Sequence, residues 1–558
     1  MFLKLLLPLI IASSAIIPQS QVTPKQSIDD VIIEGSGDKF QLTDVSYSSE
    51  TSFVYTSVAN FESGQACGIA FGSIQDDHYW VFNVDRYENR TKLIYFSEGN
   101  LPQEIVTDYI IGNDKVTESE LNFINPLLRE NARFHLKMVL TVQSDKTYAE
   151  FFIDNIKRFG VDTQIDLNEY HTYEGGYLGY NIFNSKVKFS NTTYGESDYT
   201  YYTELYRNQY HYSQFSHWNN DPNGLVFYDG WYHMYYQTNP FSKEWGPMFW
   251  GHARSRDLIH WQELPIALFP DDGNMGVGLG TGYAWSGIAM VYHQGMSTFI
   301  DDEGWFPDGE GLLGYYTRDG AMQDQVIITS NDSGMTWVKR RHIPQGLVES
   351  SGKVDCRDPS IFPMKKSGSK VTLWGMVLSG GTQNKIWYLK SEDMVNWSYA
   401  GVFDYIYPEC VTVSNINNEH YVMTVSSRYY ALGDFVYNDD SELIEFHNLN
   451  GKLISQADFT KMDYGEDSYA AQCFYIDDPN SKYYGKSVSI SWYSGLPSDA
   501  ESGNATYGSV RDPWNGGGMT IPVILGIKDN VLTQTPIILD NNDVEKEEII
   551  VFDALEIV

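Results

Sequence analysis

Basic residues are scarce in this sequence. The 558 residues include 38 Lys and Arg against 73 Asp and Glu, which gives a formal net charge of −35. Proteins that bind nucleic acid or an anionic membrane surface need a basic patch to do so. We therefore expect neither nucleic acid nor a membrane among the partners, and we make no prediction of the oligomeric state.

Cysteine is also scarce, and the four cysteines lie far apart in the chain, at Cys67, Cys356, Cys410 and Cys473. Such scattering provides neither a disulfide framework nor the spacing of a zinc site. The glycine run at 516–518 is not followed by the lysine of a phosphate-binding loop. We expect neither a metal ion nor a cofactor.

Long apolar runs are absent except at the N-terminus. There, Lys4 precedes an apolar stretch over residues 5–17, which is too short to span a bilayer. Small residues favour cleavage after Ala15, so residues 1–15 are predicted to be a signal peptide of a secreted protein, with a buried strand as the alternative. Five N-x-S/T sequons are compatible with secretion and glycosylation: Asn89, Asn191, Asn331, Asn396 and Asn504.

Aromatic residues are abundant, with 14 Trp, 41 Tyr and 28 Phe. This excludes a disordered acidic protein and favours strands. Short aromatic runs such as Tyr79–Val84 and Tyr148–Ile153 are separated by turn residues. We predict that residues 30–197 form a β-sandwich of short strands, followed by a polar boundary segment.

A turn motif repeats in the second part of the chain. Each copy has Ser-x-Asp and then, three or four residues later, Trp, as in 255–261, 330–337 and 391–397. Asp caps such a turn and Trp opens the next strand. A period of roughly 65 residues matches one four-stranded sheet, and residues 205–535 have room for five. Radial repetition of such sheets predicts a five-bladed β-propeller, with a coincidental motif in a sandwich as the alternative.

Three carboxylates stand at positions where propeller blades would begin. Asp221 lies in Asn-Asp-Pro-Asn-Gly, Asp358 in Arg-Asp-Pro and Glu409 in Pro-Glu-Cys. They are separated by 137 and 51 residues, about two blades and one blade, so they could meet in one axial pocket. Paired carboxyl groups are the machinery of glycoside hydrolysis. Taken singly, each motif could instead be a turn or a surface ion pair.

In combination, the three motifs indicate one protein family more specifically than any of them does alone. Trp218-Asn-Asn-Asp-Pro-Asn-Gly224, Arg357-Asp-Pro359 and Glu409-Cys410, in this order, resemble glycoside hydrolase family 32, the family of invertases, inulinases, levanases and fructosyltransferases. The likeness extends over about 205–535. It includes the blocks Trp231–Pro240, Trp245–Trp261, Trp285–Gly287 and Met462–Gln472.

The resemblance implies a role for each carboxylate. Asp221 would be the nucleophile, Glu409 the acid/base and Asp358 the transition-state stabiliser. The fructose pocket would be lined by Asn220, Gln237, Trp245, Trp285, Ser286 and Arg357. The implied activity is hydrolysis of terminal β-D-fructofuranosides in sucrose, inulin or levan through a covalent fructosyl-enzyme. Blade core is the alternative location for the two tryptophans.

Two departures from the family pattern leave alternatives open. Val411 follows Glu-Cys where many family hydrolases carry Pro, so transfer to a sugar could compete with hydrolysis. A non-catalytic fructan-binding protein and a five-bladed glycosidase of another family, acting on arabinose or xylose polymers, are further alternatives.

The second departure concerns the domain order. Family members usually carry a β-sandwich after the propeller, whereas here residues 536–558 form only a tail and the β-rich segment lies in front. That segment would either bind fructan or support the propeller, and we favour support.

Overall fold

The computed structural model describes residues 26–538 except 74–77, 89, 98–99, 110–132, 144–145, 154–155, 160–164, 197–207, 209, 215–217, 240–244, 271–281, 321, 349–354, 366–371, 466 and 494–516. The predicted signal peptide, Asn89, Asn504 and most of the predicted tail lie outside these residues. The described part is almost entirely strand. Its helical elements are α2 (Thr298–Asp302) and the 3-10 turns η2 (Leu167–Glu169), η3 (Gln345–Leu347), η4 (Gly381–Gln383) and η5 (Gln456–Asp458). None of these described helices is long and apolar enough to cross a membrane.

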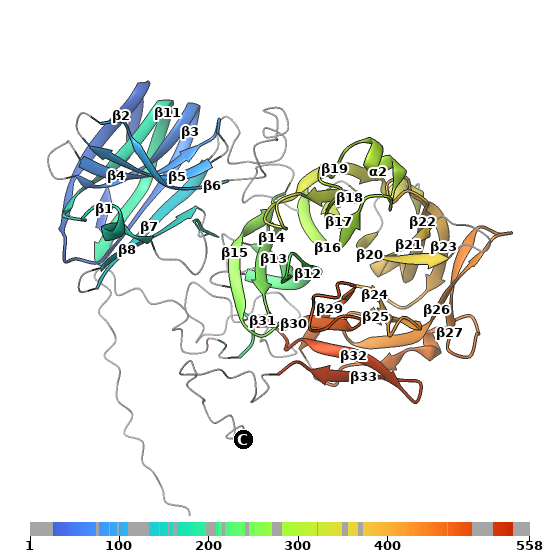
Figure 1. Ribbon diagram of the computed structural model, residues 1–558. Coiled ribbons are helices and arrows are strands. Elements are labelled where there is room, and N and C mark those ends of the chain that lie inside the picture. Colours follow the sequence, from blue (N-terminus) through green and yellow to red (C-terminus); the bar gives the residue numbers. More distant parts are fainter. Residues whose placement is uncertain are drawn as a thin grey trace, which may run out of the picture.

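The N-terminal part is an antiparallel sheet of eleven strands (Figure 1). They are β1 (Gln26–Ile28), β2 (Val31–Ser48), β3 (Phe53–Ser73), β4 (His78–Asp85), β5 (Arg90–Ser97), β6 (Gln103–Tyr109), β7 (Arg133–Gln143), β8 (Lys146–Ile153), β9 (Ile156–Lys157), β10 (Ile165–Asp166) and β11 (Gly175–Glu196).

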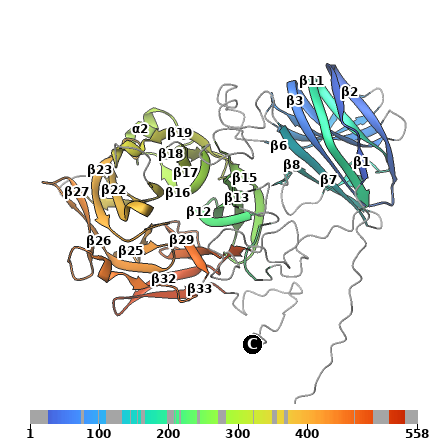
Figure 2. The same cartoon turned by 180° about the vertical axis from the view of Figure 1, so that it is seen from behind.

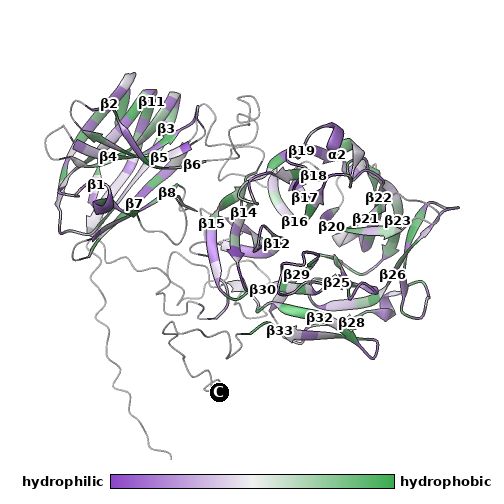
Figure 3. Ribbon diagram, in the orientation of Figure 1, coloured by the Kyte–Doolittle hydropathy of each residue, from purple (hydrophilic) through white to green (hydrophobic). Residues whose placement is uncertain are grey.

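Two long strands, β3 and β11, pair with each other along most of their length. They connect the half of the sheet that contains β7 with the half that contains β4. The first part of β3 pairs with β7, and its second part pairs with β4. Alternate residues of both halves face one apolar cluster that contains, for example, Phe82, Leu136 and Ile182. The alternation of apolar and polar residues is visible along these strands in Figure 3. This arrangement is consistent with the predicted β-sandwich.

The second part of the chain forms five sheets, each a meander of successive antiparallel strands. Blade 1 has β12 (Trp218–Tyr228), β13 (Trp231–Asn239), β14 (Phe249–Ser255) and β15 (Trp261–Leu268). Blade 2 has β16 (Tyr283–His293), β17 (Glu310–Asp319), β18 (Gln323–Ser330) and β19 (Val338–Ile343). Blade 3 has β20 (Arg357–Lys365), β21 (Thr372–Ser379), β22 (Lys385–Ser391) and β23 (Ser398–Asp404).

The last two blades each carry one short extra strand. Blade 4 has β24 (Thr412–Ile416), β25 (His420–Val425), β26 (Tyr429–Asn438), β27 (Leu443–Asn448) and β28 (Thr460–Lys461). Blade 5 has β29 (Ser468–Tyr475), β30 (Ser487–Tyr493), β31 (Gly518–Met519), β32 (Val523–Lys528) and β33 (Val531–Pro536).

The first strands of the blades contact one another in a closed ring, in the order β12, β16, β20, β24, β29 and back to β12. Figures 1 and 2 show the five sheets arranged around a common centre. The predicted five-bladed β-propeller is confirmed. Its first strands are the innermost ones, so the ends of these strands define the mouth of the axial channel.

The Ser-x-Asp motifs form the turns between the third and fourth strands of blades 1, 2 and 3, as predicted. In blade 1, the Asp257 carboxylate accepts hydrogen bonds from the main-chain N–H groups of Ile259 and His260, each at 2.8 Å. Asp393 accepts the equivalent pair in blade 3, at 2.9 and 2.7 Å. The tryptophan of each motif stands at or directly before the fourth strand. The local capping therefore sets where each outer strand begins.

The N-terminal sheet and blade 1 share apolar packing. Phe249, Ile266 and Phe269 of blade 1 belong to the same cluster of buried residues as the core of the N-terminal sheet, and β9 contacts β15. Each of the three side chains is at most 6% exposed. The N-terminal sheet therefore covers part of the apolar outer surface of blade 1.

Blade 1 also buries a histidine pair. His233 Nδ1 and His252 Nε2 lie 3.0 Å apart on neighbouring strands, and both side chains are at most 1% exposed. Burial lowers the pKa of His233 to about 4, with a further contribution from Arg254. Burial, His233 and Arg254 together lower the pKa of His252 well below its ordinary value. Both rings are therefore neutral in the folded protein.

We predict that this pair makes folding sensitive to mild acid. An unfolded chain protonates histidine near pH 6.5, whereas the folded pair resists protonation, so stability falls as the pH drops from about 6.5 towards 4. The loss is up to about 1.4 kcal/mol per pH unit for each histidine. Denaturant unfolding of His252→Gln between pH 7.5 and 5 should show a shallower pH dependence than the parent. His78→Gln, at an exposed position, should retain the parent slope, and an equal slope in both variants would contradict the prediction.

Candidate active site

The inner strands carry β-bulges at the same end of the propeller. In four of the five blades the ladder between first and second strands shifts register there, between Asn219 and Pro222, Ala284 and Gly287, Arg357 and Ser360, and Tyr469 and Gln472. A bulge leaves a residue unpaired, bends the strand and redirects its side chain. The residues inside these shifts include Asp221, Ser286 and Asp358, so the bulges turn these polar side chains towards the axis.

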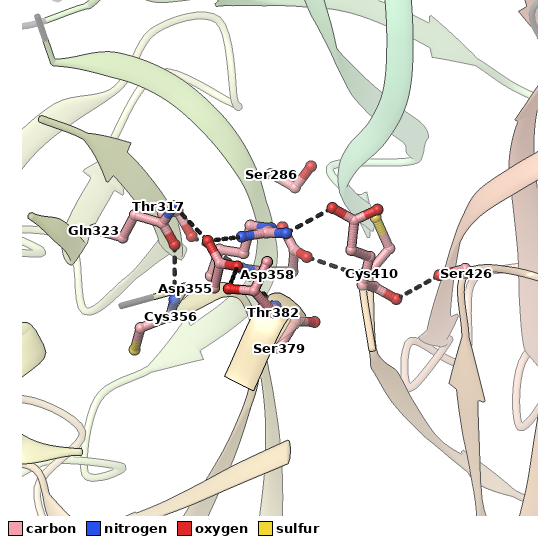
Figure 4. Close-up of polar contacts among 12 residues, drawn as sticks. Ser286, Thr317, Gln323, Asp355, Cys356, Asp358, Ser379, Thr382, Cys410 and Ser426 are labelled. Atoms are coloured by element: carbon pink, nitrogen blue, oxygen red, sulfur yellow. Dashed lines mark hydrogen bonds and ion pairs between the residues drawn. The ribbon is translucent and has the colours of Figure 1, made fainter. Parts of the chain in front are cut away.

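All five blades contribute to one pocket at this end of the channel. Its lining includes one short segment from each blade, at or directly before the start of the inner strand: Asp221–Pro222, Ser286–Ile288, Asp358–Pro359, Cys410–Thr412 and Ala470–Gln472. Figure 4 shows Ser286, Asp358 and Cys410, from blades 2, 3 and 4, close to one another. Asp221 lies in blade 1, Asp358 in blade 3 and Glu409 directly before the first strand of blade 4, so they are about two blades and one blade apart.

Asp221 lies on β12 and receives hydrogen bonds from three predicted pocket residues. Asn220 Nδ2 donates to its Oδ1 at 3.2 Å, and Gln237 Nε2 and Ser286 Oγ donate to its Oδ2 at 3.1 and 2.5 Å. Loss of surrounding water raises the pKa of Asp221, and the hydrogen bonds from Ser286 and Asn220 offset part of that rise. These donors fix the carboxylate in one orientation and favour its anionic form.

Asp358 lies on β20 and is buried. Its Oδ2 accepts a hydrogen bond from the main-chain N–H of Cys410 at 2.7 Å, and its own N–H donates to Thr317 Oγ1 at 2.9 Å. Its φ is 58°, a left-handed conformation that costs energy for a residue other than glycine. Burial raises the pKa of Asp358 to about 7, although neighbouring Arg357 acts in the opposite direction. Asp358 can therefore exist in either protonation state near neutral pH.

Glu409 stands in the connection that leads into β24. Its Oε1 accepts a hydrogen bond from Arg357 NH2 at 2.6 Å, and its Oε2 accepts one from the Tyr469 hydroxyl. Its main-chain oxygen is held by the N–H and hydroxyl of Ser426, at 3.0 and 2.9 Å. Blades 3 and 5 thus hold the side chain of Glu409, and blade 4 holds its main chain.

Arg357 is the cation among these carboxylates. Burial lowers the pKa of its guanidinium, but Asp358, Glu409 and Asp355 outweigh that effect and raise the pKa above its ordinary value. Arg357 therefore stays charged and partly neutralises the negative pocket.

The two predicted tryptophans differ in burial: Trp245 is exposed, whereas Trp285 packs against the buried cluster of Trp218, Met248 and Tyr283. Trp245 and Trp285 meet edge to face, with ring centroids 6.4 Å apart. Trp245 is 39% exposed, whereas Trp285 is half-buried and its main-chain oxygen accepts a hydrogen bond from Trp250. Trp285 is next to Ser286 in the chain, so this pair places aromatic faces beside the hydroxyl that binds Asp221.

Two residues whose side chains contact Asp221 or Glu409 were missed as site candidates from the sequence, although both lie in motifs that carry the resemblance. Cys410 Sγ lies 3.5 Å from Asp221 Oδ2, and Tyr469 binds Glu409. Cys410 is adjacent to Glu409, and Tyr469 lies in the block Met462–Gln472. Their positions in these motifs were the available signal, but the motifs do not say which neighbour faces the pocket.

Comparison with known proteins assigns the family. The family model described as glycosyl hydrolases family 32 N-terminal domain matches residues 211–536, more than half of the chain. The chain belongs to glycoside hydrolase family 32. The matched range coincides with the propeller and contains every residue of the pocket described above.

Several family 32 relatives are similar to this chain. A fructan beta-fructosidase of Streptococcus mutans is 32% identical over 358 residues, which are 61% of this chain and 23% of the relative. A levanase of Bacillus subtilis is 35% identical over 298 residues, 49% of this chain and 39% of the relative. The chain thus matches well under half the length of these two relatives. The exo-inulinase structure from Aspergillus awamori is 26% identical, with a TM-score of 0.47, over 60% of this chain and 68% of that one.

We predict that Arg357→Leu destabilises the family 32 propeller in a pH-dependent way. Removing the cation leaves buried carboxylates unpaired, which typically costs about 3–5 kcal/mol. Because the pKa of Asp358 is about 7, protonation relieves part of this cost at pH 6, and the loss should be larger at pH 8. Denaturant unfolding at both pH values measures it. Arg256→Leu, at an exposed arginine, should show a small loss that is the same at both pH values, and a pH-independent loss in Arg357→Leu would contradict the prediction.

Proposed function

We propose that this family 32 chain is a secreted, retaining β-fructofuranosidase that hydrolyses terminal β-D-fructofuranosides in sucrose or in fructans such as inulin and levan. The observation that carries the proposal is that Asp221 and the Glu409-Cys410 pair meet at one pocket. Cys410, the residue after Glu409, lies within 3.5 Å of Asp221. Two carboxyl groups at one site are what glycoside hydrolysis requires.

In the proposed first step, Glu409 gives its proton to the departing glycosidic oxygen while a carboxylate oxygen of Asp221 attacks the anomeric carbon. The carbon–oxygen bond to the leaving group breaks, and a fructosyl ester on Asp221 forms. In the second step Glu409 takes a proton from water, the water oxygen attacks the same carbon, and Asp221 departs as a carboxylate. Two inversions give net retention.

The remaining pocket residues support these steps. Asn220, Gln237 and Ser286 hold Asp221 in place through their hydrogen bonds. Asp358 would accept hydrogen bonds from sugar hydroxyls that strengthen as positive charge develops on the ring. Trp245 and Trp285 offer apolar faces to sugar C–H groups. No step requires a metal ion or a cofactor.

The proposed substrates follow the names of the relatives. The two relatives compared above are named fructan beta-fructosidase and levanase, and others are named sucrose-6-phosphate hydrolase. Secretion is proposed from residues 1–15, whose composition is that of a signal peptide.

The direct test is to incubate the purified protein with sucrose, inulin and levan, separate the products, and follow the anomeric form of the first fructose released by NMR. We expect free fructose that appears first as the β-anomer. Fructose released as the α-anomer would refute retention, and fructo-oligosaccharides as main products at high sucrose would identify a transferase. Absence of turnover with sugar binding retained would identify a binding protein.

We predict that Asp221→Asn folds but loses about 10⁴-fold in rate, which corresponds to roughly 5.4 kcal/mol in the barrier. The amide cannot act as an anionic nucleophile. Steady-state kinetics on sucrose measures the loss. Asp229→Asn, in the turn between β12 and β13 at the other end of blade 1, should keep the parent rate. Residual activity of Asp221→Asn within tenfold of the parent would refute the nucleophile assignment.

We also propose that the N-terminal sheet supports the propeller. A shortened chain that begins near Thr203 would expose Phe249, Ile266 and Phe269, which pack against that sheet. We predict that it melts at a lower temperature and loses activity on sucrose and on levan together. If activity falls on levan alone, the sheet is a fructan-binding module, and if melting and both activities are unchanged, both roles are refuted.

A further inference from the structure

The turn between β21 and β22 holds the segment that carries Glu409. The N–H of Gly381 donates to the main-chain oxygen of Pro408 at 3.1 Å. Asn384 accepts two hydrogen bonds, one on its main-chain oxygen from the N–H of Tyr405 at 3.0 Å and one on Oδ1 from the N–H of Tyr407 at 2.8 Å. The path of the chain just before Glu409 is therefore set by residues 381–384.

The same turn also holds Asp355, two residues before Arg357. The N–H and hydroxyl of Thr382 both donate to Asp355 Oδ2, at 2.8 and 2.5 Å. The N–H of Asp355 donates to Gln383 Oε1 at 2.7 Å. Figure 4 shows Asp355 and Thr382 together beside Asp358. One turn thus fixes two segments of the active site that lie more than 50 residues apart in sequence.

The contact is too close for any residue but glycine at position 381. A Cβ there would lie 2.6 Å from Asp355 Oδ2 and 2.8 Å from Arg357 NH2, and Gly381 has a φ of +37°. The turn therefore leaves room for the carboxylate and the guanidinium to approach each other.

Asp355 and Glu409 bind opposite arms of the same guanidinium. Arg357 NH1 lies 2.7 Å from Asp355 Oδ1, and Arg357 NH2 lies 2.6 Å from Glu409 Oε1. The Arg357 side chain is only 11% exposed. Because a guanidinium is a rigid planar fork, fixing one arm on Asp355 fixes the direction of the other arm towards Glu409.

Asp355 is itself held in its charged form. Burial raises the pKa of its carboxyl, but the hydrogen bonds from Thr382 and the charge of Arg357 outweigh burial and leave the pKa below its ordinary value.

Several charged and titratable groups act on Glu409 besides Arg357. They come from blades 1, 3, 4 and 5: Asp221, Asp358, Cys410 and Tyr469. If Asp355 became neutral, the whole positive charge of Arg357 would act on the two remaining carboxylates, Asp358 and Glu409. A larger share of that charge would then fall on Glu409, the proposed proton donor, which contacts Arg357 NH2 directly.

We propose that Asp355, clamped by Thr382, is a positioning residue that aims Arg357 at the acid/base Glu409 and shares the charge of that guanidinium with it. The inference rests on the proposed fructosidase function. It goes beyond that function because Asp355 touches neither substrate nor reacting atoms.

The test compares pH profiles of kcat/KM for Asp355→Asn and the parent on two substrates. Sucrose needs a protonated leaving group, whereas β-fructosyl fluoride does not. For sucrose, the alkaline limb of Asp355→Asn should move by about one unit to lower pH, as expected for an uncompensated opposite charge, with about tenfold loss at pH 7. For fructosyl fluoride the rate at pH 5 should change less than threefold. A profile that superimposes on the parent, or equal losses on both substrates, would overturn the proposal.

Asp393→Asn is the matched control. Asp393 caps the Ser391–Trp397 turn of the same blade between its third and fourth strands, at the other end of the propeller, so its variant should lose stability and keep the parent pH profile. If it moves the alkaline limb as Asp355→Asn does, the shift reflects loosened structure and the proposal fails.

Variants of Thr382 test its hydrogen bonds to Asp355 without changing the charge of the site. They also provide the test if Asp355→Asn does not fold. Thr382→Val should lower the ratio of sucrose to fructosyl fluoride turnover severalfold, and Thr382→Ser should restore the parent ratio. An unchanged ratio in Thr382→Val would overturn the role of the clamp. If the parent turns over neither substrate, the proposed function fails, whereas an active parent with unshifted variants refutes only the positioning role.

Discussion

The active site depends on how buried negative charge is balanced around one cation. Three carboxylates, Asp355, Asp358 and Glu409, act on the guanidinium of Arg357, and a fourth, Asp221, acts on Asp358. Burying unpaired carboxylates costs several kcal/mol each, so the surplus must be met by hydrogen bonds or by protonation. The pKa of Asp358 rises to about 7 and that of Asp221 is also raised. Protonation of Asp358 near neutral pH therefore meets part of the surplus, and the hydrogen bonds to Asp221 meet another part.

The propeller supplies the geometry for this balance. Five inner strands converge on an axis, but a regular strand would send alternate side chains to the two faces of its blade. The bulges in blades 1, 2, 3 and 5 interrupt that alternation at the pocket and turn side chains inward. Left-handed backbone at Asp358, Cys410 and Ala470 accompanies this arrangement, with φ between 46° and 58°. Residues with strained backbone occur frequently at functional sites, where the surrounding structure holds them in that conformation.

The sequence predicts the blades well because their signals are local. An Asp that caps its own turn needs only the next few N–H groups, so the Ser-x-Asp motifs locate the turns of blades 1, 2 and 3. The spacing of 137 and 51 residues predicts that Asp221, Asp358 and Glu409 come from different blades.

What the sequence does not predict depends on contacts between distant segments. A bulge has no clear sequence signature, so the direction of Asp358 could not be predicted. Cys410 meets Asp221 across 189 residues, and Thr382 meets Asp355 only because two strand ends converge at the same mouth. The exposure of Trp245 likewise depends on which loops surround it.

The central claim is that Asp221 attacks the anomeric carbon while Glu409 first donates and later accepts a proton. Trapping the covalent intermediate tests this claim most directly. Glu409→Gln should still react with β-fructosyl fluoride, because fluoride leaves without protonation, but it should hydrolyse the resulting ester slowly for want of a base. Mass spectrometry of the acid-quenched, digested protein should then find one anhydrohexose unit on the peptide that contains Asp221. An adduct on another carboxylate, or no adduct while fluoride is released, would contradict the account.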